Sequence, residues 1–269
     1  MHIRETISKF FADRGTHLAA MIAYFALLSF VPLVFLALAL LGLSGRANES
    51  SYFVTELQKI FPGASISSIV TVIRTIQQNA TSLGIVGGAF LLWSSLSLFS
   101  VLESAFNIVY DRPNRRFLHG KALAVVFMLA SLVTLVVGLV VGSIGFEVLK
   151  RYASGFIGNS VVAYGLSLIV SSLAVLLFLV SAYFRLTNAD LSIRDVLPGA
   201  IVATVGLETT FQILPAYLRL SKEVPALQAL GGPAILLVWL YVMANVIVFG
   251  AEVNWWRTHG RDGTVAGPR

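Results

Sequence analysis

The chain lacks cysteine and contains few charged residues. With no Cys among 269 residues, disulfide bridges, thiolate chemistry and Cys-based zinc sites are excluded. Charged residues make up 12% of the sequence, whereas a soluble domain averages roughly 25%. In contrast, 57% of the residues are hydrophobic and the mean hydropathy is +0.84. This composition is typical of an integral membrane protein.

The usual signatures of catalysis are also missing. There is no P-loop, no Gly-x-Ser-x-Gly sequence and no arrangement that predicts a nucleophile triad. The four histidines are dispersed and show no metal-binding spacing: His2, His17, His119 and His259. We therefore expect no catalytic residue, no metal site and no cofactor, and the protein is predicted not to be an enzyme. A nucleic acid partner is not expected either, because the net charge of +6 is explained by basic flanks of membrane spans.

Long apolar segments organise the whole chain. They predict an all-α, polytopic membrane protein in which residues 1–269 form one integral membrane domain. The six predicted transmembrane helices cover residues 18–43, 83–110, 122–146, 161–184, 196–217 and 233–256. The first of these is too long for a cleavable signal and is predicted to be retained.

The segments outside the spans also have helical patterns. Residues 1–17 are predicted to form an interfacial helix, with an apolar stripe of Ile3, Ile7, Phe10 and Phe11 opposite Arg4, Lys9 and Arg14. The first extracytoplasmic loop carries two apolar stripes separated by Pro62 and Gly63, which predict amphipathic helices. Residues 218–232 are predicted to be a linker, and residues 257–269 a cytoplasmic tail.

The distribution of basic residues predicts the orientation. The N-terminus, the second and fourth links and the C-terminus together carry 12 Lys and Arg, whereas the other three links carry 7. The positive-inside rule then places both termini in the cytoplasm. Within the second link, Arg112, Arg115 and Arg116 are candidates for binding anionic lipid headgroups.

Three acidic residues lie inside the apolar segments, namely Glu103, Glu208 and Glu252. A carboxylate at the centre of a bilayer costs several kcal/mol, so such residues usually face the protein interior or a water-filled cavity. No Lys or Arg is expected near them. We therefore predict one polar groove that is also lined by four other residues: Asn107, Asn245, Asn254 and Tyr24.

The acids have two interpretations. A buried carboxylate without a cation can change its charge by taking up a proton, which would permit proton-coupled movement of a substrate. Alternatively, Glu103 and Glu252 lie near the inner interface and hold helices together, while Glu208 lies nearest to the middle of the membrane.

Three segments resemble one known family. Residues 19–33 (Ala-Ala-Met-Ile-Ala-Tyr-Phe-Ala-Leu-Leu-Ser-Phe-Val-Pro-Leu), residues 105–110 (Ala-Phe-Asn-Ile-Val-Tyr) and residues 249–254 (Phe-Gly-Ala-Glu-Val-Asn) are similar to the YihY/BrkB family of bacterial inner-membrane proteins. The resemblance extends over essentially the whole chain. It implies a six-span fold and involvement in lipid handling or lipid export, with a link to virulence, and it supplies no catalytic residue.

Three functional hypotheses follow. The leading one is lipid handling or export, with membrane lipids as the partners. The second is a structural or scaffolding membrane protein of the cell envelope without transport activity, which could bind a second copy or an envelope protein. The third is a membrane-bound enzyme, in line with a ribonuclease label used in the family, but the sequence shows no nucleophile or metal site for it.

Overall fold

The computed structural model describes residues 3–43, 80–116, 118–127, 129–130, 160–223 and 225–259. In these ranges the protein is all-helical, as predicted, and contains no strand. The amphipathic helices predicted in the first loop, most of the third predicted span and the C-terminal tail lie outside the described residues.

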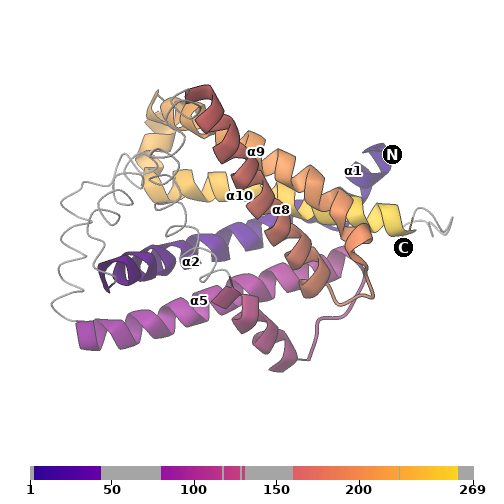
Figure 1. Cartoon of the computed structure of the whole chain (residues 1–269), viewed down its shortest axis with the longest axis horizontal. Helices are drawn as coiled ribbons and strands as arrows, with labels where there is room; N and C mark the ends of the chain where they lie inside the picture. Colours follow the sequence, from indigo (N-terminus) through magenta and orange to yellow (C-terminus); the bar gives the residue numbers. More distant parts are fainter. Residues whose placement is uncertain are drawn as a thin grey trace.

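Six long or well-defined helices make up most of the described chain (Figure 1). They are α1 (Ile3–Ala12), α2 (Gly15–Leu43), α5 (Ala80–Val109), α8 (Ser160–Leu186), α9 (Ile193–Glu223) and α10 (Pro225–His259). A further short apolar helix covers Leu118–Phe127. The helices α2, α5 and α8 coincide with predicted apolar segments to within a turn at each end.

Three helices are long and apolar enough to cross a membrane among the described residues. The apolar stretches are Leu168–Leu186 in α8, Ile193–Leu214 in α9 and Ala234–His259 in α10. Shorter apolar helical stretches cover Gly15–Ser29, Leu96–Val109 and Leu118–Phe127. The chain is therefore a membrane protein by its helices, and the count of six spans stays a prediction.

The prediction of a linker at residues 218–232 is wrong, because residues 218–223 and 225–232 are helical. Helix α9 continues to Glu223 and α10 begins at Pro225. Proline is well tolerated in the first turn of a helix, where its missing N–H would have no intrahelical partner. Gly231 and Gly232 were assigned to the linker and Pro233 to the start of the last span, but all three lie within α10.

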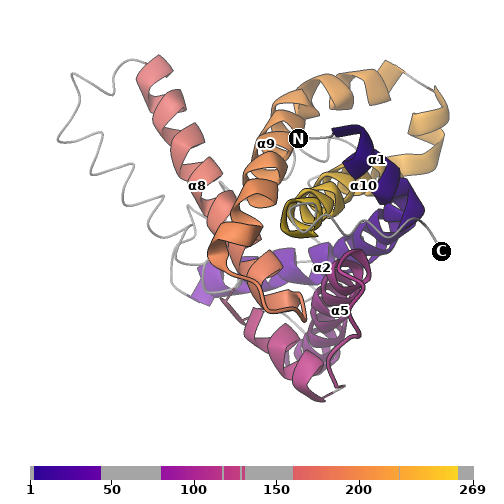
Figure 2. The same ribbon diagram turned by 90° about the vertical axis from the view of Figure 1, so that its right-hand side faces the viewer.

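The helices pack with both described ends of the chain at one end of the bundle (Figure 1). Helix α10 packs against α9 and α2, α2 packs against α5, and α8 packs against α9. Figure 2 views the molecule from this end and shows α1 beside the end of α10. The first helix is thus close to the last, although they are far apart in sequence.

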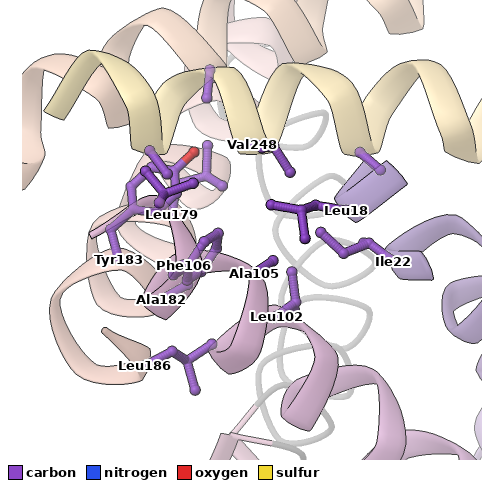
Figure 3. Close-up of a cluster of buried hydrophobic side chains, with 14 of the residues drawn as sticks. Leu18, Ile22, Leu102, Ala105, Phe106, Leu179, Ala182, Tyr183, Leu186 and Val248 are labelled. Carbon is purple, nitrogen blue, oxygen red and sulfur yellow. The ribbon is translucent and has the colours of Figure 1, made fainter. Parts of the chain in front are cut away.

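The buried apolar cluster lies where α2, α5, α8 and α10 meet (Figure 3). Phe106 of α5 and Tyr183 of α8 are almost fully buried and pack edge to face, with ring centroids 5.0 Å apart. The Tyr183 hydroxyl donates a hydrogen bond to the carbonyl of Ile247 in α10 at 2.7 Å. The cluster therefore fixes α8 against both α5 and α10.

Candidate functional site: polar side chains buried between the helices

Glu252 of α10 is completely buried and faces a lysine from the first helix. Lys9 Nζ lies 3.2 Å from Glu252 Oε2 and also forms an ion pair with Asp13. The same ammonium donates a hydrogen bond to the carbonyl of Val109 at 2.9 Å and lies 4.1 Å from the centre of the Trp255 ring. Removing one partner of a buried ion pair costs roughly 3–5 kcal/mol, because the other charge is left uncompensated. Lys9 therefore connects α1, the end of α5 and the end of α10.

Other contacts seat α1 on the same surface. Thr6 and Phe10 are buried, and the Phe10 ring packs edge to face against Phe249 of α10 at 6.1 Å. The indole N–H of Trp256 donates a hydrogen bond to Glu5 at 3.0 Å. The turn into α2 passes so close to Phe10 that a Cβ on Gly15 would lie 2.4 Å from its ring. A residue with a side chain at this position would displace the ring.

The predicted orientation of α1 is therefore wrong in part. The sequence placed Phe10 and Phe11 together on the apolar side and Lys9 on the polar side. In the structure Lys9 and Phe10 face the bundle, whereas Ile7 and Phe11 are 43% and 63% exposed. The reason is that Lys9 has a buried carboxylate to pair with, which no periodicity within residues 1–17 could indicate.

Glu103 of α5 also has a cationic partner. Arg115 Nη1 lies 3.4 Å from Glu103 Oε1, and the backbone N–H of Arg115 points at the same oxygen. Glu103 is only 5% exposed. The expectation that the buried acids have no cation nearby is thus wrong for both Glu103 and Glu252. The helix periodicity had assigned these acids to a polar side without showing which residue would approach it.

Arg115 caps the C-terminal end of α8. Its guanidinium donates to the carbonyls of Leu186 and Thr187, at 2.6 and 2.9 Å. The last carbonyls of a helix lack intrahelical donors, and a cation there is also favoured by the helix dipole. The headgroup role of Arg112, Arg115 and Arg116 stays a prediction; Arg112 and Arg116 are exposed, whereas Arg115 has these partners within the protein.

Asn107 is the centre of a hydrogen-bond network next to Arg115. Its Oδ1 accepts a hydrogen bond from the backbone N–H of Asn188 at 2.7 Å, and its Nδ2 donates to Asn114 at 3.0 Å. The side-chain amide of Asn188 in turn donates a hydrogen bond to the carbonyl of Pro113. Asn107 is fully buried, and it holds together the two connections that follow α5 and α8.

Asn254 faces α9, on the side of α10 away from Glu252. Its Oδ1 accepts a hydrogen bond from the backbone N–H of Gly199 at 2.6 Å. Residues two positions apart on a helix point about 200° apart, so Glu252 and Asn254 cannot line the same surface of α10. Asn245 donates to the carbonyl of Tyr241 one turn earlier in its own helix, and Tyr24 is 53% exposed on α2.

Glu208 is in a third setting, between α9 and α8. Its Oε1 accepts a hydrogen bond from the Ser171 hydroxyl at 2.9 Å, and Ser171 is exposed. Both residues lie within apolar stretches long enough to span a membrane. The described contacts therefore divide the three acids among different partners: Arg115, Ser171 and Lys9. Sequence reasoning missed all three pairings: Lys9 and Ser171 come from other helices, and Arg115 lies in the connection after α5, 12 residues from Glu103.

The helices and buried polar contacts define a helical membrane protein whose spans are joined by charged and amide side chains. A family model described as virulence factor BrkB matches residues 6–268. The chain belongs to this family, and the resemblance stated from its sequence is confirmed. No solved structure matches the chain.

Curated relatives cover nearly the whole chain. The ribonuclease-like protein YfkH of Bacillus subtilis is 27% identical over 94% of this chain and 93% of its own length. A UPF0761 membrane protein of Vibrio vulnificus is 25% identical over 94% of this chain and 80% of its own length. A UPF0761 membrane protein of Chromohalobacter salexigens is 24% identical over 94% of this chain and 62% of its own length.

Proposed function

We propose that this protein handles lipid in the cytoplasmic membrane, as a six-span protein with both termini in the cytoplasm. The observation that carries the proposal is the Glu208–Ser171 pair, which lies in two membrane-length apolar helices. Around the pair, the outer sides of these helices expose large apolar residues: Val170, Leu173, Leu177, Val205 and Phe211. The polar pair is thus open toward the region that acyl chains would occupy.

The chemistry of the pair favours a particular kind of headgroup. A carboxylate accepts hydrogen bonds and repels phosphate, so Glu208 suits a hydroxyl or ammonium group of a lipid headgroup. No Lys or Arg forms an ion pair with Glu208 among the described residues. Coupling of lipid movement to protons is part of the proposal, since a change in the charge of a carboxylate changes its attraction for such a group.

A lipid-flux assay tests the proposal. The purified full chain is reconstituted into liposomes with a fluorescent aminophospholipid, and the rate at which the label changes leaflet is measured with a membrane-impermeant quencher. We expect Glu208→Gln and Ser171→Ala to lower the rate, and Thr209→Val to leave it unchanged. Thr209 is a matched control because it is exposed beside Glu208 and bonds only to the carbonyl of Val205 in its own helix among the described contacts. A wild-type rate equal to that of protein-free liposomes, or full flux in Glu208→Gln, would refute the proposal.

A structural role is the second candidate, and two observations favour it. Glu103 and Glu252 are each buried against a cation that comes from another part of the chain. Ion pairs of this kind hold segments of the helix bundle together. If the protein is only a scaffold, Glu103→Gln lowers thermal stability and no variant changes lipid flux.

An enzymatic role is not part of the proposal. The name of the Bacillus subtilis relative contains the word ribonuclease, but no group of three or more His, Cys, Asp or Glu that could hold a metal ion occurs among the described residues. We expect the purified protein to leave RNA intact under conditions in which it moves lipid. A role in virulence is proposed from the name of the family alone.

A further inference from the structure

Two carboxylates share one ammonium group at the seat of α1. Lys9 forms ion pairs with Glu252, which is fully buried, and with Asp13, whose side chain is 23% exposed. Beyond the ion pair with Lys9, neither oxygen of Glu252 has a hydrogen-bond partner among the described residues. Lys9, in contrast, also has the Val109 carbonyl and the Trp255 ring as partners. With both acids ionised, this largely buried cluster carries one excess negative charge.

The other titratable groups nearby do not remove this excess. At the end of α5, the Tyr110 hydroxyl is buried and experiences the charges of Glu252 and of Asp195 at the start of α9. Three further side chains that can carry positive charge are exposed: Arg14 in the turn before α2, His17 in α2 and Arg257 in α10. The His259 ring stacks on Trp255 and contacts Thr258. Lys9 is thus the cation that the described contacts bring to Glu252.

An excess buried charge destabilises the contact that buries it. An isolated ionised carboxylate is costly to remove from water, and it is relieved either by neutralisation or by access to water. Access to water at Glu252 requires α1 to move, because Thr6, Lys9 and Phe10 of α1 cover this part of α10. The charge state of the cluster and the docking of α1 are therefore coupled.

We propose that Lys9, Asp13 and Glu252 form a proton-sensitive latch that controls the docking of α1 on the end of the helix bundle. One proton bound by the Glu252 carboxylate leaves the Lys9–Asp13 pair balanced and holds α1 in place. Loss of that proton to solvent restores the excess negative charge and loosens α1. Low pH therefore favours docking of α1, and high pH favours its release. This inference does not depend on lipid handling.

The absence of cysteine from the chain allows a direct test. A single Thr6→Cys substitution places a thiol on the buried side of α1, and Phe11→Cys places one on the side that is 63% exposed. The labelling rate of each purified full-length protein with a maleimide is measured from about pH 6 to about pH 9, and their ratio removes the pH dependence of the thiol itself. Over the pH range in which the released state has lost the proton and the docked state still holds it, we expect the ratio to rise by up to about tenfold per pH unit, as release of one proton requires, and to level off once the docked state has lost it as well.

Substitutions in the cluster decide the mechanism. Added to Thr6→Cys, Asp13→Asn removes the excess charge and Glu252→Gln imitates the protonated acid, so both should keep labelling slow at every pH. Lys9→Met should make labelling fast at every pH at which Glu252 is ionised. The control Asp111→Asn neutralises an exposed acid at the same end of the molecule and should keep the wild-type profile.

Two results would overturn the proposal. One is a wild-type ratio that stays constant over the whole pH range. The other is an unchanged pH profile in Asp13→Asn, which decides the matter even if Glu252→Gln fails to fold, because Asp13 is partly exposed and its replacement leaves a balanced pair.

Discussion

Gly199 of α9 donates its backbone N–H to the side-chain oxygen of Asn254 in α10, at 2.6 Å. The two helices are close enough here that a Cβ on Gly199 would lie 1.9 Å from the carbonyl oxygen of Gly250. Small residues allow such close approach of helices in membranes, where packing and interhelical hydrogen bonds replace the hydrophobic effect as the source of stability. This crossing positions the end of α10 that carries Glu252.

Replacement of Gly199 by alanine should therefore disrupt the crossing. The added methyl would overlap with the Gly250 carbonyl and with Asn254, and overpacking of this kind costs roughly 1–3 kcal/mol. We expect a clear drop in the thermal midpoint of the purified protein, measured by tryptophan fluorescence in detergent. Gly165→Ala is the matched control, because nothing lies within 4 Å of its added Cβ. Equal midpoints in the two variants would contradict the described crossing.

Arg115 should be replaceable neither by glutamine nor by lysine without loss of stability. Its two terminal nitrogens each bond to a different carbonyl at the end of α8, and a lysine cannot reproduce this fork. Loss of hydrogen bonds from a charged group costs roughly 1.5–3 kcal/mol, so Arg115→Lys should lower the thermal midpoint and increase amide exchange around residues 183–188. Arg116→Lys changes an exposed residue and should have no effect. If both variants behave alike, the capping role is disproved.

Asn107→Leu should destabilise the connection after α8, because Asn107 accepts a hydrogen bond from the backbone there. The substitution removes the acceptor of the Asn188 N–H and the donor to Asn114, and a buried polar group left without a partner costs roughly 1–3 kcal/mol. We expect faster proteolysis at the connection after α8, measured by limited trypsin digestion at Arg185 and Arg194. Asn245→Leu serves as control, since Asn245 bonds only within its own helix among the described contacts; wild-type digestion in Asn107→Leu would argue against the network.

Phe10→Ala should release α1 without changing any charge. The ring is 7% exposed and packs against Phe249 and Gly15, and truncation of a buried Phe costs roughly 3–5 kcal/mol. We expect rapid hydrogen exchange throughout Ile3–Ala12, with exchange in α8 unaffected. Phe11→Ala, on the 63% exposed side of α1, should retain protection. Retained protection in Phe10→Ala would show that the ring does not seat the helix.

The positions of the apolar helices were predictable, because each long helix carries its own signal in composition and length. The all-helical class and the segments covered by α2, α5 and α8 could be read from local sequence. The region around Pro225 could not, since proline at the start of a helix and proline in a linker look alike in a single sequence. Only packing against neighbouring helices decides between them.

The buried acids were predictable as residues but not as contacts. Glu103, Glu208 and Glu252 stand out because charges are rare in apolar segments, yet each finds its partner outside its own helix: Arg115, Ser171 and Lys9. Periodicity describes one helix at a time and does not indicate which surface of another helix will meet it. For this reason Lys9 was assigned to the solvent side of α1, and Asn254 was grouped with Glu252 although they point in different directions.

The placement of α1 has a consequence for biosynthesis. This helix is translated long before its seat, which is built from Phe249, Glu252, Trp255 and Trp256. Until α10 has been made, Lys9 has no Glu252 carboxylate to meet, and α1 can dock only after α10 has reached its place in the bundle. Docking of α1 would thus report that α10 is in place, and a nascent chain cut short before residue 249 would leave the buried side of α1 open to quality-control proteases.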